Sequence, residues 1–175
     1  EEIGDKYGIG TSLNNIGVVH ENKGDYEKAL DYYARSLAIC EELGDKRGMG
    51  FPLVNLGGMY IYKGDYETAL DYLGRSLKIA EEIGDKYGME HSIKMLGRVY
   101  ADKGDYETAL DYIARSLSIA EELGDKYGMG GSLSNIGVVH KIKGDYDNAL
   151  DHWKKSLVIH KELGDKPMIG FDLGN

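Results

Sequence analysis

A sequence motif that returns every 40 residues constrains the fold of this chain more than any other feature. The string Lys-Gly-Asp-Tyr begins at positions 23, 63, 103 and 143, and Gly-Asp-Lys begins at positions 4, 44, 84, 124 and 164. Residues 41–80 and 81–120 are identical at 25 of 40 positions. A period of this length is typical of repeat proteins, in which each unit buries its apolar face against its neighbours.

Two apolar patterns with helical spacing occur in each repeat. In the second repeat the spacing predicts a first helix, here called helix A, over 46–62, and a second, helix B, over 66–83. Between them, Gly64 suits a left-handed C-terminal cap and Asp65 suits an N-cap. The predicted fold class is all-α: an α-α superhelix, or solenoid, of about four antiparallel helix pairs.

The period also divides the chain into segments of one continuous solenoid domain. Both ends cut a repeat within an element, so we expect a fragment of a longer array or an open-ended one. The predicted segments are the end of a preceding helix B with a linker (1–8), four repeats (9–44, 45–84, 85–124 and 125–164) and the start of a truncated fifth repeat (165–175).

Composition excludes several classes of function. The formal net charge of −9 and the pI near 5.0 argue against a nucleic-acid partner, and no apolar run approaches the roughly 18 residues of a membrane span. The single cysteine, Cys40, excludes an internal disulfide and a cysteine-based metal site, and favours a reducing compartment, the cytoplasm. We expect no metal and no cofactor.

Glycines in the middle of helix A indicate close helix packing. They occupy one position of the period, where glycine costs about 1 kcal/mol relative to alanine. Alanines on the facing helix B would let the two backbones approach and so offset this cost. The glycines are Gly17, Gly57, Gly97 and Gly137, and the alanines are Ala29, Ala69, Ala109 and Ala149.

These residues carry a resemblance to a known family. Leu56-Gly57-x2-Tyr60 with Ala69 resembles the tetratricopeptide pattern, and the other three repeats carry the same or a related string. With its 40-residue period, the chain is most similar to the long-repeat subclass found in Pins-type polarity adaptors and kinesin light chains. The resemblance implies a curved right-handed superhelix in which helices A line a concave groove, and a scaffold or adaptor that binds protein segments there.

Outward positions of helix A are the candidate partner-binding residues that the resemblance implies. One position holds asparagine in three repeats, and in similar proteins this amide often holds the backbone of a bound peptide; a local bond within the helix is the alternative. Apolar members of the set predict a track for a helical or extended segment, unless some of them pack against helix B instead. The candidates are Asn14, Asn15, Val18, Phe51, Val54, Asn55, Tyr62, His91, Lys94, Arg98, Asn135 and Val138.

Charge refines the expected partner. The helix A segments 9–23, 49–63, 89–103 and 129–143 together carry +4, so the rest of the chain carries −13. A groove that is neutral to mildly positive favours an apolar or mildly acidic protein or peptide segment.

Catalysis is not expected, and two alternatives to the adaptor hypothesis stay open. The five histidines show no metal-ligand spacing, and the acidic pairs recur at each end of helix B as part of the repeat. The main alternative is end-to-end self-assembly through uncapped terminal repeats around Ile3 and Leu173, which would give a homo-oligomer. A consensus-designed array is the second, against which Cys40 and Pro52 argue.

Overall fold

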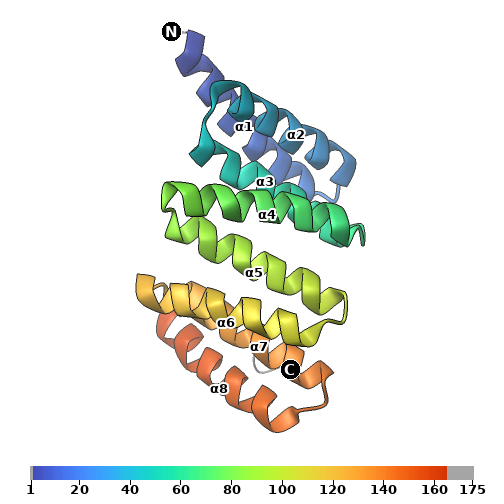
Figure 1. Ribbon diagram of the computed structural model, residues 1–175, viewed down its shortest axis with the longest axis vertical. Helices are drawn as coiled ribbons and strands as arrows, with labels where there is room; N and C mark the ends of the chain where they lie inside the picture. Colours follow the sequence, from blue (N-terminus) through green and yellow to red (C-terminus); the bar gives the residue numbers. More distant parts are fainter. Residues whose placement is uncertain (1, 165–175) are drawn as a thin grey trace. The chain divides into compact units, whose positions relative to one another are not determined.

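Eight α-helices make up the described part of the chain. The computed structural model describes residues 2–164, with side chains from Lys6 onward, and no strand occurs in this range. The all-α prediction is confirmed, and helices A and B of the second repeat have the predicted bounds. In chain order the helices are α1 (Glu2–Asn22), α2 (Tyr26–Leu43), α3 (Lys46–Tyr62), α4 (Tyr66–Ile83), α5 (Lys86–Asp102), α6 (Tyr106–Leu123), α7 (Lys126–Ile142) and α8 (Tyr146–Leu163) (Figure 1).

Contacts divide the chain into two compact units, residues 1–95 and 96–175, with the division inside α5. In the first unit α1 packs on α2, α2 on α3 and α3 on α4, and the two A helices α1 and α3 also touch. In the second unit α6 packs on α7 and α7 on α8. Within each unit these helices pack against their neighbours in sequence, as a solenoid of helix pairs requires.

Short connections between helices follow the predicted glycine and aspartate chemistry. Gly64 has a φ of 74°, and Gly84 ends α4 with a φ of 69°, the left-handed conformation that glycine adopts at low cost. The Asp65 side chain accepts a hydrogen bond from the Thr68 backbone N–H at 3.1 Å. This bond caps the first turn of α4.

The start of the chain differs from the expectation for residues 1–8. Residues 2–8 belong to α1, which runs through Gly4 and Asp5 without a break, rather than to an earlier helix B and a linker. Glycine within a helix costs only about 1 kcal/mol, so this pair does not by itself end a helix. The predicted fifth repeat, 165–175, lies outside the described residues.

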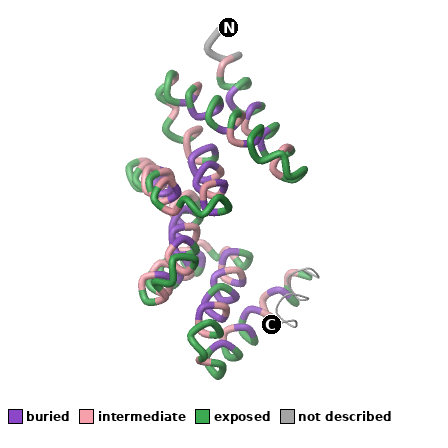
Figure 2. Tube along the Cα trace, turned by 90° about the vertical axis from the view of Figure 1, so that its right-hand side faces the viewer, coloured by how far each residue is buried: buried purple, intermediate pink, exposed green. Residues whose placement is uncertain are grey.

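Close packing of helix A on helix B explains the glycines in the middle of helix A. A Cβ atom on Gly57 would lie 2.6 Å from Leu73 Cγ, and one on Gly137 would lie 2.5 Å from Trp153 Nε1. The close contact of each glycine is therefore with a large side chain, Leu73 or Trp153, which lies four residues after the repeated alanine of helix B. Ala69 itself is fully buried. Figure 2 shows that buried residues follow the helix faces that meet other helices, whereas the turns are exposed.

Candidate functional site

A groove of about 570 Å³ lies between α3, α4 and the first half of α5. Its apolar floor comes from α4, through Ile79, Ala80 and Ile83, and its walls are the A helices on either side. A Cβ atom on Gly50 would touch no other group within 4 Å, so this part of α3 leaves open space.

The side chain at position 80 decides whether this space is open. In the fourth repeat the equivalent of Ala80 is His160, whose ring is buried and lies against Gly130, the equivalent of Gly50. A Cβ atom on Gly130 would lie only 2.5 Å from His160 Nε2. The same position of the fold is thus filled by an imidazole on α8 and left open above Ala80 on α4.

Aromatic side chains stand at the rim of the groove. Phe51 on α3 is 70% exposed and Tyr87 on α5 is 60% exposed, although both line the groove. Below Phe51, Val54 is buried and forms part of the wall. Large aromatic residues that remain exposed beside an apolar hollow are typical of binding sites, because a partner gains much by covering them.

Charges at the groove are mostly paired within the protein. Lys46 Nζ donates to Glu82 Oε2 at 2.8 Å, and Lys94 Nζ donates to Glu90 Oε1 at 3.2 Å. Glu90 is buried, and it replaces the glycine that the other three repeats have at this position. Arg47 differs from these residues: within residues 6–164 its guanidinium forms no hydrogen bond or ion pair.

His91 contributes no positive charge at neutral pH. His91 is exposed, but the protein groups packed around it partly desolvate its ring and the charge of Lys94 adds to this effect, so the pKa of His91 is lowered from its ordinary value of 6.5. Three cationic residues, Lys46, Arg47 and Lys94, and two acidic ones, Asp85 and Glu90, line the groove. The groove is therefore mildly positive in a chain whose net charge is −9.

A second hollow of about 340 Å³ lies between α1, α2 and α3. Arg47 and Phe51 line both hollows and so form the ridge between them. Across this ridge, Asn55 Nδ2 donates to Asn14 Oδ1 at 3.0 Å, which ties α3 to α1. Cys40 also lines the second hollow, and burial raises the pKa of its thiol, so the sulfur is protonated at neutral pH rather than a nucleophile.

Seven of the twelve predicted partner-binding residues line the two hollows. Asn14, Asn15 and Phe51 line the smaller one, and Phe51, Val54, Asn55, His91 and Lys94 line the larger one. The other five lie outside both hollows: Val18, Tyr62, Arg98, Asn135 and Val138.

Two of these five residues, Tyr62 and Arg98, contact other side chains of the protein. Tyr62 stacks on Tyr26 with ring centroids 6.3 Å apart, and Arg98 lies 3.7 Å from an Asp102 carboxylate oxygen. Val18 and Asn135 are exposed, and Val138 is half-buried. Arg47 and Tyr87 also line the groove and were not among the predicted residues, because the candidates in these two repeats began at Phe51 and His91 and left out the first turn of helix A.

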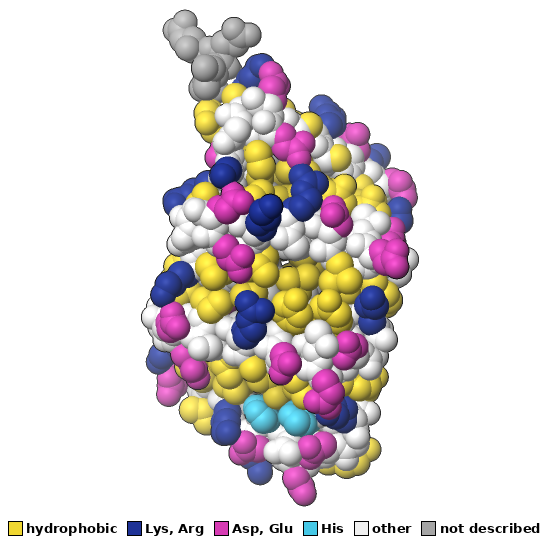
Figure 3. All heavy atoms as spheres, viewed as in Figure 1, with side chains coloured by type: hydrophobic (Ala, Val, Ile, Leu, Met, Phe, Trp, Pro, Cys, Tyr) yellow, Lys and Arg dark blue, Asp and Glu magenta, His cyan; other side chains and the backbone are white. Residues whose placement is uncertain are grey.

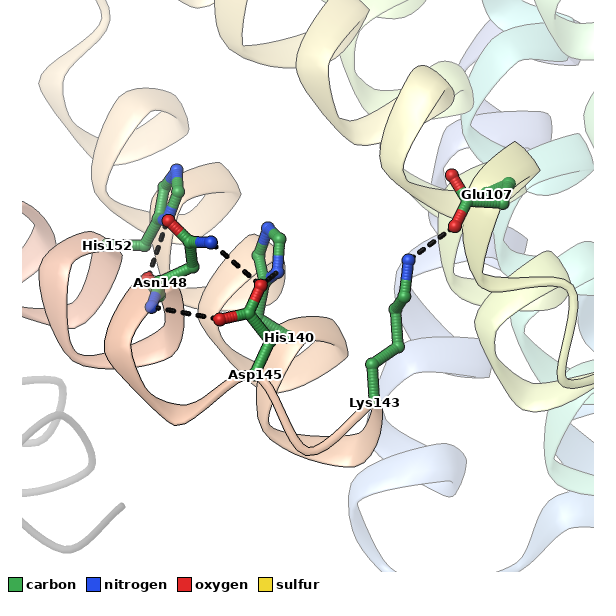
Figure 4. Close-up of polar contacts among 6 residues, drawn as sticks. All are labelled: Glu107, His140, Lys143, Asp145, Asn148 and His152. Carbon is green, nitrogen blue, oxygen red and sulfur yellow. Dashed lines mark hydrogen bonds and ion pairs between the residues drawn. The ribbon is translucent and has the colours of Figure 1, made fainter.

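Histidines outside the groove have structural contacts. His140 and His152 stack with ring centroids 5.4 Å apart, at the position where the second and third repeats have a tyrosine pair. His140 Nδ1 is hydrogen-bonded to Asp145, and His152 Nδ1 donates to the Asn148 carbonyl oxygen at 2.8 Å (Figure 4). Among the side chains that the structure describes, no three histidine, cysteine or acidic residues are grouped to hold a metal ion.

Charged residues elsewhere form ion pairs between elements. Lys143 pairs with Glu107 (Figure 4), and Lys126 Nζ lies 2.7 Å from Glu162 Oε2. On the face drawn in Figure 3, lysine and arginine side chains are interspersed with aspartate and glutamate. None of the helices in residues 2–164 is long and apolar enough to cross a membrane.

Taken with the repeat, this arrangement defines a class: a helical-repeat solenoid with an open groove between successive A helices. The family model of the tetratricopeptide repeat matches residues 8–82, 49–122 and 89–157. The chain belongs to the tetratricopeptide repeat family. Members of this family generally serve as non-catalytic protein-interaction modules. No curated protein matches the chain significantly.

Solved structures of helical-repeat proteins share the fold. A Rap protein in complex with competence and sporulation factor aligns with a TM-score of 0.88 and 18% identity over 98% of this chain and 47% of its own. BtubC (BKLC) from P. vanneervenii aligns with a TM-score of 0.77 and 20% identity over 89% of this chain and 65% of its own.

A third similar structure holds the nearly identical repeats of a kinesin light chain-type protein from Podospora anserina. Its TM-score is 0.71 and its identity 14%, over 87% of this chain and 74% of its own. At such identities the likeness establishes the fold. The chain spans about two thirds of the BtubC structure and about half of the Rap structure.

Proposed function

We propose that the chain is a non-catalytic adaptor, acting in the cytoplasm, that binds a short apolar or mildly acidic segment of a partner protein in the groove between α3, α4 and α5. The observation that carries this proposal is Phe51, a phenylalanine 70% exposed at the rim of a 570 Å³ hollow with an apolar floor. Covering apolar surface contributes about 25 cal/mol per Å².

The groove offers both apolar and polar contacts to such a segment. An apolar side chain of the partner would lie against Phe51 and over Ile79 and Ile83 of the floor. Asn55 uses one amide N–H on Asn14, which leaves a second N–H and its carbonyl oxygen for the partner's backbone.

The adjoining hollow and the remaining predicted residues extend the proposal. Asn14 and Asn15 would contact a longer segment that crosses the ridge into the smaller hollow. Contact of the partner with Val18, Tyr62, Arg98, Asn135 and Val138 stays a prediction from the family resemblance.

Selection from a random peptide library tests the proposal. Wild-type protein is expected to enrich a set of related apolar peptides, and Phe51→Glu is expected to weaken binding of a selected, synthesised peptide by about tenfold or more, because it replaces the rim contact with a charge. Val158→Glu is the matched control, since Val158 is exposed on α8 and lines neither hollow. Equal binding by wild type and Phe51→Glu would contradict the groove assignment.

A second candidate function, end-to-end self-assembly, is favoured by the outer face of α1. Ile16 is 40% exposed, whereas its equivalent Leu56 in α3 is 2% exposed, because α2 covers it. At the other end Leu150 of α8 is exposed, whereas its equivalent Leu30 packs at the α2–α3 junction. Helix α1 of one copy would thus meet α8 of another copy in the register of α2 and α3. The side chain of Ile3 and all of Leu173, named in the sequence analysis, lie outside the described residues.

Light scattering across a concentration series separates the two functions. If copies stack, the apparent mass of the wild type rises with concentration and that of Ile16→Glu stays at 19.4 kDa. Peptide binding in the groove is expected to be the same in both proteins. A wild type that stays monomeric at every concentration would exclude stacking.

A further inference from the structure

Arg47 differs from its equivalents in the other three repeats. Those positions hold tyrosine, at Tyr7, Tyr87 and Tyr127. Arg47 is exposed in the first turn of α3 and lines both hollows. The two other cationic residues of the groove are held by carboxylates of the chain, Lys46 by Glu82 and Lys94 by Glu90. Arg47 is therefore the cation of this site that is available to a ligand.

The position of Arg47 relative to Phe51 sets the spacing between the two side chains of a bound segment that would contact them. The two residues are four apart on one helix, so their side chains lie on the same face, with Cβ atoms about 5–6 Å apart. In an extended segment, side chains two residues apart point to the same side at about 6.6 Å. One extended segment therefore fits both residues when its two contact side chains are separated by one residue.

We infer that the bound segment carries a carboxylate two residues from an apolar side chain, the carboxylate on Arg47 and the apolar side chain on Phe51. This inference rests on the proposed function, since it specifies the chemistry of the segment in the same groove. A guanidinium binds a carboxylate through two parallel N–H groups, which fixes the orientation of the segment as well as adding attraction. The mildly positive charge of the groove, in a chain that is acidic as a whole, also favours a negatively charged group in the ligand.

Two parallel selections from one random peptide library test the inference, one on wild type and one on Arg47→Tyr. The tyrosine variant restores the residue of the other repeats, so the helix is expected to fold unchanged. Wild type is expected to enrich aspartate or glutamate two positions before or after an apolar residue. Arg47→Tyr is expected to enrich the apolar residue without the acidic one.

Binding of one selected peptide then measures the contact. Changing its acidic residue to the amide is expected to weaken binding to wild type by about fivefold, the size of an exposed ion pair, and to leave binding to Arg47→Tyr unchanged. Arg47→Lys keeps the charge and loses the planar pair of donors. In this variant the change from acid to amide is expected to weaken peptide binding by less than in wild type and by more than in Arg47→Tyr.

Each other outcome overturns a defined claim. Acidic enrichment that persists in Arg47→Tyr, or apolar enrichment without acidic residues on wild type, overturns the inference while leaving groove binding in place. Failure of wild type to enrich any peptide, or the same enrichment by wild type and Phe51→Glu, overturns the proposed function together with the inference.

Discussion

Replacing Ala80 with histidine is expected to abolish peptide binding in the groove while leaving the fold intact. On α8 the equivalent residue His160 is buried against Gly130, so an A–B helix pair of this fold accommodates an imidazole at this position. On α4 the same ring would occupy the space above Gly50 that a peptide side chain needs. We expect the affinity for a selected peptide to fall by about a hundredfold or more, which corresponds to about 2.7 kcal/mol.

Fluorescence anisotropy with a labelled peptide measures this loss, and circular dichroism shows whether the variant stays helical. Ser118→His is the matched control, because Ser118 is exposed on α6 and lines neither hollow. Binding by Ala80→His that equals the binding by wild type and Ser118→His would show that the peptide lies elsewhere.

Alanine substitutions of two helical glycines are expected to change stability in opposite directions. In Gly137→Ala the new Cβ would lie 2.5 Å from Trp153 Nε1 and 2.7 Å from Trp153 Cδ1, so a rigid indole must move. Such overpacking costs about 1–3 kcal/mol, against a helix-propensity gain of about 1 kcal/mol. Gly74→Ala in α4 meets no other group within 4 Å, so only the gain remains.

Urea denaturation followed by helicity measures both effects. The midpoint is expected to fall for Gly137→Ala and to rise for Gly74→Ala, relative to wild type. Because repeat arrays can unfold in more than one step, midpoints are compared rather than extrapolated free energies. A shift of the same sign in both variants would contradict the close contact of Gly137 with Trp153.

Local signals in the sequence were sufficient to predict the helices. Apolar spacing together with the Gly-Asp pairs predicted α3 and α4 with the bounds that the structure has, since these pairs end a helix with glycine and start the next with a capping aspartate. Residues 2–8 show the limit of such a signal: Gly4 and Asp5 lie within α1, and only packing decides whether such a pair ends a helix.

The groove was less predictable, because its shape depends on pairs of residues from different helices. Whether a hollow opens is decided by Ala80 facing Gly50 rather than His160 facing Gly130, a relation that no single motif contains. Tyr62 was assigned to an apolar track, and its ring stacks on Tyr26 of a neighbouring helix B, a contact that the spacing within helix A does not indicate. The break of the tyrosine pattern at Arg47 was readable in the sequence as a departure from the repeat.

Photo-crosslinking tests the central claim, that the groove between α3, α4 and α5 binds a peptide segment, most directly. A selected peptide carries a benzophenone side chain in place of its apolar contact residue, and mass spectrometry locates the crosslink on the full chain. Crosslinks within residues 46–55 or 79–94 are the result that the proposal predicts. Crosslinks on the outer face of α1 or on α8, with none in those two segments, would contradict it.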